Sequence, residues 1–349
     1  MTHPAVTATG PADNQLALPL GPVSAAELSL SVIIPVHNGG GKFRQCLQSV
    51  AASTLPPTEI VVVADGDSDG AWRAAEEFGA RVVHLPETGG PARARNAGAR
   101  AARGDVLVFL DADVVVAPAV LAKITDAFDC EPGVAAVIGS YDDAPAETNF
   151  LSQYKNLFHH YVHQTSRAEA STFWAGCGAV RRDLFLALGG FDETYRQPSI
   201  EDIEFGYRLR RAGHAIRLCH SLQVKHLKRW TVGSLLRADV LLRAVPWTEL
   251  IQRNGRFVND LNLTWSARAA VVLGWLAALE IGAVLWCRWL LALAAGALAA
   301  MWALHAGLLR FFRVKRGWGF MLAAAAWLWL YDLYSGLGFA LGLARHWTR

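Results

Sequence analysis

The sequence lacks paired cysteines, and this excludes two kinds of small stabilised scaffold. Its 349 residues contain five cysteines, all far apart: Cys46, Cys130, Cys177, Cys219 and Cys287. An odd and dispersed set argues against both a disulfide framework and a structural zinc site. We therefore predict small, buried thiols in a reducing compartment.

Net charge is also nearly absent. The formal charge of +3 at pH 7 gives no basic excess of the kind that binds nucleic acid, so no nucleic-acid partner is expected. The N-terminal stretch has neither the charged region nor the long apolar region of a signal peptide. Its proline, glycine, alanine and threonine content predicts a disordered tail over residues 1–27.

Charged side chains become scarce towards the C-terminus. Between Ala269 and Leu309 only Glu280, Arg288 and His305 can carry charge. Because about 20 apolar residues cross a bilayer, residues 266–349 are predicted to form a membrane domain with two to three transmembrane helices. The candidate spans are Ala269–Cys287, Trp289–Leu309 and Phe320–Leu343.

A basic link over residues 310–317 separates the second span from the third. Positively charged loops stay in the cytoplasm, and two crossings before the link place the N-terminal domain on that same side. We expect a multi-pass protein of the cell inner (plasma) membrane whose main domain faces the cytoplasm. Arg345 and Arg349 conflict with this orientation unless the third segment is re-entrant or lies along the interface.

The segment 230–265 mixes apolar and basic residues. Two interpretations stay open for it. It is either an amphipathic helical segment on the membrane surface or an ordinary set of domain helices.

Before this segment, short apolar runs alternate with helical patterns. The predicted strands cover 28–36, 59–66, 81–86, 105–113 and 134–141, and the predicted helices cover 42–53, 71–79, 92–103 and 118–128. Near-continuous apolar strands alternating with helices indicate an α/β domain with a mostly parallel, Rossmann-like sheet covered on both faces.

Ligands of such sheets bind at the carboxyl ends of the strands. Asn38, Asp65 and the pair Asp111/Asp113 all follow predicted strands. Two carboxylates one residue apart repel each other unless a metal ion, an arginine or water lies between them. Close carboxylates suit a divalent metal, Mg²⁺ or Mn²⁺, although a solvated turn rich in aspartate is the simpler interpretation of this pair alone.

Another candidate site is GGPARARNAG (89–98), which follows the third predicted strand. Proline starts a helix well, and a helix N-terminus attracts anions. Arg93 and Arg95 present guanidinium groups that suit phosphate or carboxylate. The pair is either an anion site or two surface arginines.

Five segments occur in a familiar order: SVIIPVHN, VVVADGDSDG, GGPARARNAGARAARGDVLVFLDAD, AGCGAVRRDLFLALGGFDE and EDIEFGYRLRRAG. Together they resemble the family 2 glycosyltransferases over nearly the whole of residues 28–229. The resemblance implies a GT-A fold, a nucleotide-diphospho-sugar donor, a divalent metal and inversion at the anomeric carbon. It makes residues 28–229 a catalytic domain that precedes the C-terminal transmembrane helices.

The resemblance also implies roles for individual residues. Asp202 is expected to act as the general base with Glu201 beside it, and Asp113 to bind the metal together with Asp111. His226 is either a further metal or phosphate ligand or a structural histidine. The residues expected to contact the nucleotide base are Pro35, His37, Asn38 and Asp65. Asp111 is expected to contact the ribose or the sugar, and Arg95 to help hold the donor. A further set either shapes the acceptor pocket or packs in the core: Trp174, Cys177 and Gly178. The sequence departs from the family pattern at Ala64, where a second acid is usual, and at His37, where tyrosine is usual.

We therefore expect an inverting glycosyltransferase that moves a sugar to a membrane-associated, lipid-linked acceptor. One alternative is a processive polysaccharide synthase, but HLKRW (226–230) lacks the Gln-x-x-Arg-Trp spacing of such enzymes. The other is a non-catalytic membrane scaffold that binds a nucleotide-sugar. The acids at positions 113 and 202 favour the enzyme.

Overall fold

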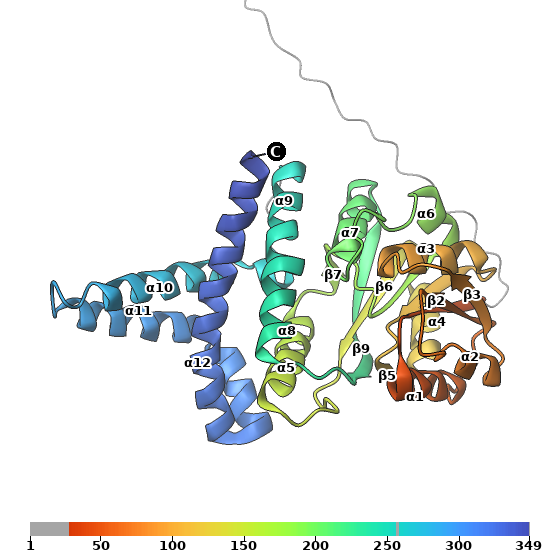
Figure 1. The fold of residues 1–349 in the computed structure, drawn as a ribbon, viewed down its shortest axis with the longest axis horizontal. Helices are drawn as coiled ribbons and strands as arrows, with labels where there is room; N and C mark the ends of the chain where they lie inside the picture. The colour runs from red at the N-terminus through yellow and green to blue at the C-terminus, as the bar shows by residue number, and fades with distance from the viewer. Residues whose placement is uncertain (1–27, 256–257, 349) are drawn as a thin grey trace, which may run out of the picture.

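The structure is a computed structural model, and it describes residues 28–255 and 258–348. The tail predicted over residues 1–27 lies outside the described residues. Within them, nine strands form one sheet in the order β3-β2-β1-β4-β8-β6-β9-β5, with β7 paired to β9. The sheet and its covering helices occupy one end of the molecule and the long C-terminal helices the other (Figure 1).

The first half of the sheet is parallel, as predicted. Its strands are β1 (Leu30–Val36), β2 (Glu59–Asp65), β3 (Arg81–Leu85) and β4 (Val106–Leu110). Ile33 of β1 lies opposite Val61 on one side and Phe109 on the other. The helices that connect and follow these strands are also confirmed: α1 (Gly40–Ala51), α2 (Arg73–Glu77), α3 (Pro91–Ala101) and α4 (Val120–Cys130).

The strand predicted over residues 105–113 is shorter than expected. It ends at Leu110, and the segment from Asp111 to Asp113 turns before a second short strand, β5 (Val114–Val116). Burying both acids inside the sheet would remove their charges from water at a large cost in free energy. The two carboxylates therefore lie at a turn beside the sheet edge and do not alternate along one strand.

The second half of the sheet is mixed in direction. Strand β8 (Cys177–Arg181) runs antiparallel between β4 and β6 (Val134–Tyr141). Strand β9 (Ala215–His226) runs parallel to β6, and both β5 and β7 (Glu169–Ala170) are antiparallel to β9.

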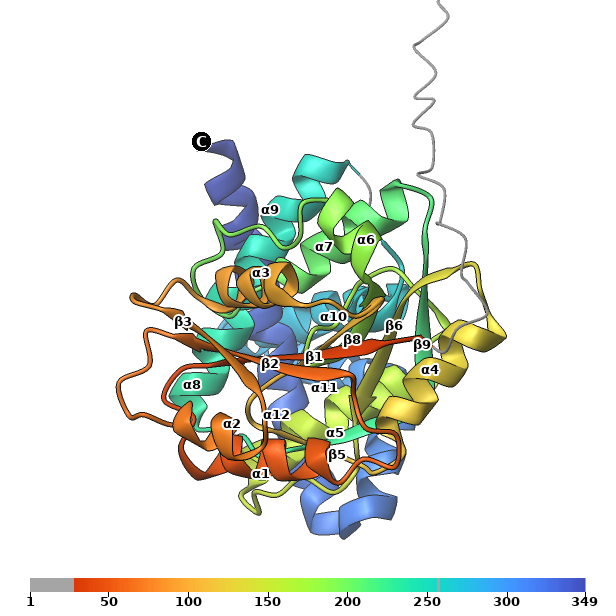
Figure 2. The ribbon, with the colours of Figure 1, turned by 90° about the vertical axis from the view of Figure 1, so that its right-hand side faces the viewer.

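Apolar side chains cover both faces of the sheet. Val32, Val62 and Val108 pack with α1 on one face, whereas Ile33 and Phe109 pack with α3 on the other. Figure 2 shows α3 on one side of the sheet and α1 and α2 on the opposite side. The Phe109 ring lies 5.2 Å from the rings of both Phe185 and Phe191, so the chain after β8 completes this second core.

The remaining helices of the sheet domain are α5 (Phe150–Thr165), α6 (Arg182–Ala187) and α7 (Glu201–Arg211). The segment 230–265 forms α8 (Val232–Leu236), the π-helical η1 (Arg237–Ala244), α9 (Val245–Asn254) and the short η2 (Leu261–Leu263). The predicted helical character of this segment is confirmed, whereas its position at a membrane surface stays a prediction.

Two helices of the described residues are long and apolar enough to cross a membrane, α10 (Trp265–Gly282) and α12 (Ala306–Trp347). The second predicted span, Trp289–Leu309, is wrong in extent: α11 (Leu290–Leu304) has 15 residues and ends before His305. The third span lies within α12, which kinks at Gly317, where φ is +82°. Helices α10 and α11 form a hairpin that projects away from the sheet domain (Figure 1).

Helix α12 takes a different course from the hairpin and packs alongside α9 (Figure 1). Leu308 and Phe312 of α12 pack against Tyr154 and Leu157 of α5. Near the end of α12, Arg345 forms an ion pair of 2.9 Å with Glu249 of α9. Helix α12 is therefore attached to α5 and α9 along most of its length.

Candidate active site

The acids singled out in the sequence gather at one edge of the sheet, where β1, β2 and β4 end. Asp65 ends β2, and Asp111 directly follows β4. Glu201 and Asp202 come from the first turn of α7, about 90 residues further along the chain. Their convergence confirms that the carboxyl ends of the parallel strands assemble one polar site.

Arg95 joins two of these acids. Its guanidinium donates to Asp111 at 2.7 Å and to Glu201 at 2.8 Å, and its side chain is almost fully buried. Burial alone would lower the pKa of this guanidinium, but the two carboxylates hold it above its ordinary value. An arginine therefore relieves part of the repulsion at the Asp111/Asp113 pair, one of the three solutions that the sequence left open.

Asp65 holds the start of α3. Its two carboxylate oxygens accept from the backbone N–H groups of Gly89 and Gly90 at 2.8 and 2.9 Å. Gly90 has φ +90°, and a Cβ there would lie 2.2 Å from the carbonyl oxygen of Arg196. The carboxylate thus orients the loop that delivers Arg95, and its predicted contact with a nucleotide base stays a prediction.

Beside Asp65, two side chains follow β1. His37 lies with Nδ1 2.8 Å from the carbonyl oxygen of Asp65, to which it donates. Asn38 has a left-handed backbone (φ +52°), and its side-chain oxygen accepts from the N–H groups of Ser68 and Asp69. Both residues are exposed at the sheet edge, next to partly buried Pro35. They form a surface suited to a planar base, and that role stays a prediction.

Asp113 faces a different partner. Its carboxylate lies 3.7 Å from Nε2 of His226 at the end of β9. The Tyr141 ring stacks on His226 with centroids 4.1 Å apart, and its hydroxyl lies 3.3 Å from the same nitrogen. Burial acts to raise the pKa of Asp113, but the His226 ring and the positive charge of Lys228 hold it below its ordinary value. Asp113 is therefore kept ionised beside an imidazole.

These residues define what a metal site here can be. Within residues 28–255 and 258–348, no three histidine, cysteine or acidic side chains lie together as a metal-binding cluster. Asp113 and His226 form a facing pair, whereas Asp111 is engaged by Arg95. Mg²⁺ typically binds through one or two carboxylates and completes its shell with substrate phosphates. The donor set thus fits a metal that arrives with a phosphorylated ligand, and a metal role for Asp111 stays a prediction.

Asp202 lies on the other side of the Arg95 bridge. One of its oxygens accepts from the N–H of Ala175 at 3.1 Å and the other from the N–H of Ile203 at 2.8 Å. Burial, reinforced by the neighbouring charge of Glu201, raises the pKa of Asp202 to about 7. A carboxylate with this pKa is able to accept a proton near neutral pH, as a general base must.

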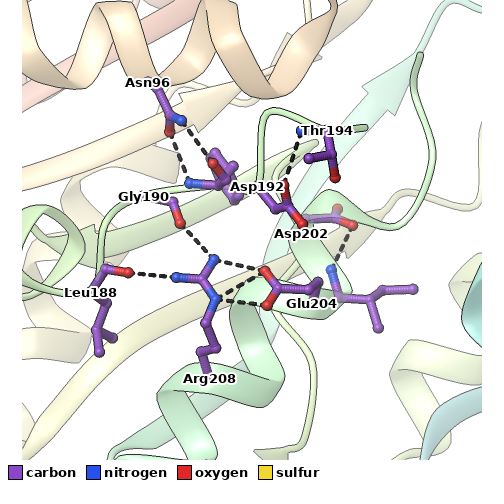
Figure 3. Close-up of polar contacts among 10 residues, drawn as sticks. Asn96, Leu188, Gly190, Asp192, Thr194, Asp202, Glu204 and Arg208 are labelled. Atoms are coloured by element: carbon purple, nitrogen blue, oxygen red, sulfur yellow. Dashed lines mark hydrogen bonds and ion pairs between the residues drawn. The ribbon is translucent and has the colours of Figure 1, made fainter. Parts of the chain in front are cut away.

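The loop before α7 is held by side chains that the sequence did not single out (Figure 3). Arg208 donates to the carbonyl oxygens of Leu188 and Gly190 and also binds Glu204. Asn96 of α3 exchanges two hydrogen bonds of 2.8 Å with the backbone of Phe191. These contacts fix the start of α7, and with it Asp202, relative to the helix that carries Arg95.

The remaining predicted residues divide between surface and core. Trp174 is half-buried and its ring meets that of Tyr141 edge-on, with centroids 4.9 Å apart. Cys177 and Gly178 are fully buried in β8, and this packing agrees with the simpler of the two interpretations given for them. Tyr141 itself was missed, although its place at the end of β6 was a signal that it reaches the same region.

Part of the chain resembles known glycosyltransferases in sequence. Residues 31–189 match the family model described as glycosyl transferase family 2. A pre-mycofactocin glycosyltransferase from Mycobacterium tuberculosis is 30% identical over 218 residues, which cover 59% of this chain and 44% of that protein. A glucosyl-dolichyl phosphate glucuronosyltransferase from Haloferax volcanii is 28% identical over 162 residues, covering 43% and 51%. The matches span about half, or less, of these relatives.

Solved structures agree on the fold. The mannosyltransferase PcManGT from Pyrobaculum calidifontis, in complex with GDP-Man and Mn²⁺, superposes with a TM-score of 0.51 at 21% identity and covers 88% of this chain and 89% of its own. Residues 31–189 therefore form a glycosyl transferase family 2 domain, and the sheet of the described residues has the GT-A fold.

The Arg95 bridge gives a direct test of the site's construction. Replacing Arg95 by glutamine leaves Glu201 buried without its cationic partner, and breaking a buried pair in this way costs about 3–5 kcal/mol of unfolding free energy. Arg93→Gln removes the same charge from the same helix at a position with no such pair, and is expected to cost less than about 0.5 kcal/mol. Denaturant unfolding of both variants measures the difference; equal losses would contradict the bridge.

Proposed function

We propose that this chain transfers a sugar from a nucleotide-diphospho-sugar to a membrane-associated, lipid-linked acceptor, with inversion at the anomeric carbon. The observation that carries the proposal is the arrangement of Asp202 and Asp113. A carboxylate whose pKa is raised to about 7 and an ionised carboxylate paired with histidine share one sheet edge, on either side of the Arg95–Asp111 ion pair.

The donor is proposed to lie along the carboxyl edge of the sheet. Pro35, His37 and Asn38 contact the base, and Asp65 lies beneath it. Asp111 contacts the ribose or the sugar, and Arg95 orients that carboxylate. The diphosphate is then placed next to Asp113 and His226, which together would hold Mg²⁺ or Mn²⁺. When bound, such an ion offsets the negative charge that builds up on the departing diphosphate.

Asp202 is proposed to receive the proton of the acceptor hydroxyl during attack. Its hydrogen bonds to Ala175 and Ile203 fix the carboxylate at the N-terminus of α7. Glu201 is paired with Arg95 and so fixes the position of Asp202, the next residue. The negative charge of Glu201 also helps burial to raise the pKa of Asp202. A base on the face opposite the leaving diphosphate produces inversion.

A membrane-associated acceptor is supported by the apolar C-terminal helices. The exposed large side chains of the α10–α11 hairpin include Val272, Leu279, Leu285, Trp286, Trp289 and Leu293. A relative from Haloferax volcanii has a lipid phosphate in its name. An enzyme held at a membrane surface meets a lipid-linked acceptor without the acceptor leaving the bilayer.

We further propose that the hairpin inserts into the cell inner membrane and that α12 lies along the interface. The basic link before Gly317 contacts the sheet domain, because Lys315 pairs with Asp143 at 2.5 Å and Arg316 donates to Gln153 at 2.7 Å. Arg345 pairs with Glu249 of α9 on the same side. This arrangement keeps every basic segment with the catalytic domain in the cytoplasm and removes the conflict over Arg345.

The role of Asp202 is tested by Asp202→Asn in the full-length protein with Mn²⁺ and a panel of nucleotide-sugars. Donor affinity is expected to stay within about twofold, while transfer falls by about 10²–10⁴-fold because the proton acceptor is lost. Wild-type transfer should fall as pH drops through about 7, since only the ionised carboxylate accepts a proton. Asp192→Asn is the matched control, because asparagine still accepts from the N–H of Thr194. Rapid transfer by Asp202→Asn would place the base elsewhere.

The membrane arrangement is tested with two native cysteines. Cys287, at the turn of the hairpin, and Cys130, at the end of α4, are both exposed, so the prediction of buried thiols is wrong for these two residues. An impermeant maleimide added to intact spheroplasts is expected to label Cys287 but not Cys130, and lysis should make both reactive. Labelling of Cys130 before lysis would reverse the proposed orientation, and protection of Cys287 would show that the hairpin does not reach the far side.

A further inference from the structure

A large cavity lies outside the site described above, between the sheet domain and the C-terminal helices. Its volume is about 720 Å³, and α5, η1, α9, α10 and α12 contribute its walls. In Figure 1, α9 and α12 run side by side between the sheet and the α10–α11 hairpin. The cavity therefore joins elements of the catalytic half to the helices proposed to contact the bilayer.

The walls of this cavity divide by chemical character. Lys155 of α5 and Asp239 and Arg243 of η1 are charged. Val271 of α10 and Phe339 of α12 are apolar, as are Leu304 at the end of α11 and Leu308 of α12. A cavity with a charged part and an apolar part matches an amphiphilic molecule better than it matches a sugar or a free ion.

The charges in the cavity favour an anion. Asp239 is already engaged by Lys155 at 2.6 Å and by the Tyr334 hydroxyl at 3.0 Å. Asp260 accepts from the N–H and hydroxyl of Ser171. By contrast, Arg243 is exposed and makes no hydrogen bond or ion pair within residues 28–255 and 258–348. A guanidinium without a partner suits a phosphate-type group.

Arg243 also lies next to the catalytic residues. The Ser199 hydroxyl, three residues before Asp202, donates to the carbonyl oxygen of Leu242 at 2.6 Å. The positive charge of Arg243 reaches Asp202, where it opposes the rise in pKa caused by burial and Glu201. The charged part of the cavity is therefore adjacent to the proposed base.

We propose that this cavity binds the acceptor: an amphiphile whose apolar chain runs along α10 and α12 and whose phosphate-type group lies against Arg243, so that the hydroxyl that attacks the sugar, carried beyond that group, lies beside Asp202. The inference rests on the proposed function, since it is the transfer reaction that requires an acceptor beside Asp202. Helix η1 supplies the anion contact, and Lys155, Asp239 and Tyr334 tie η1 to α5 and α12. The headgroup enters from the side of the bilayer, whereas the donor enters from the sheet edge.

The experiment uses the full-length protein in lipid nanodiscs and a dodecyl phosphate with a diazirine at the end of its chain. After photolysis, mass spectrometry is expected to find the label on cavity residues of α10 and α12, such as Val271 and Phe339. Unlabelled dodecyl phosphate should compete, and inorganic phosphate should not. Arg243→Gln is expected to lower labelling about tenfold through loss of a charge-assisted contact, whereas Arg253→Gln, outside the cavity on α9, should leave it unchanged.

A second pair of variants tests the apolar part. Val271→Trp fills the cavity and should lower labelling, whereas Leu293→Trp, on the exposed face of α11, should not. Equal labelling in wild type and Arg243→Gln, equal labelling by the corresponding dodecanol probe, or displacement by inorganic phosphate would each overturn the proposal. Donor binding is measured separately on the same samples, so a failure to bind any nucleotide-sugar would count against the proposed function and not against the cavity.

Discussion

The active site depends on one buried cation. Arg95 reaches from α3 to Asp111 after β4 and to Glu201 at the start of α7, and so joins segments that are 106 residues apart. Without this guanidinium, the negative charges of Asp111, Glu201 and Asp202 would lie close together in a partly buried space. With it, a positive charge balances that of Glu201, and Asp111 is held against Arg95. Asp113 remains available to face His226. The same bridge sets the position of Asp202, which follows Glu201 directly in the first turn of α7.

The sequence predicted most of the parallel half of the sheet, strands β1 to β4. The apolar runs of β1, β2 and β4 are continuous because both faces of these strands are covered, and the residues that end them lie at the ligand-binding edge. The prediction was wrong in extent for the strand over 105–113, because the charges of Asp111 and Asp113 end β4 at Leu110, and the valines that follow form the separate strand β5. The insertion of β8 between β4 and β6 left no pattern that periodicity detects, because antiparallel and parallel core strands are equally apolar.

The sequence predicted which residues lie at the site better than it predicted how they pair. Individual acids and arginines are visible in a sequence, but their pairing is not. Arg95 was expected near the donor, yet its engagement of both Asp111 and Glu201 depends on contacts distant in the chain. Tyr141 and Arg243 lie on elements whose positions follow from packing. Tyr141 ends β6 beside His226, and Arg243 lies on η1, directly after Leu242, whose carbonyl oxygen accepts from Ser199. Helix α12 illustrates the same limit, since its apolar composition predicted a span, whereas its contacts with α5 and α9 attach it to the catalytic half.

The central claim is that Arg95 binds Asp111 and Glu201, which leaves Asp113 and His226 to hold the metal, and the position of the metal tests this claim most directly. An experimental structure of the full-length protein with Mn²⁺ and a nucleotide diphosphate, recorded at the manganese absorption edge, would locate the ion by its anomalous signal. The account predicts one peak within coordination distance of the Asp113 carboxylate and Nε2 of His226, with Arg95 still joining Asp111 to Glu201. A peak coordinated by Asp111 with Arg95 displaced, or no peak at this edge of the sheet, would contradict it.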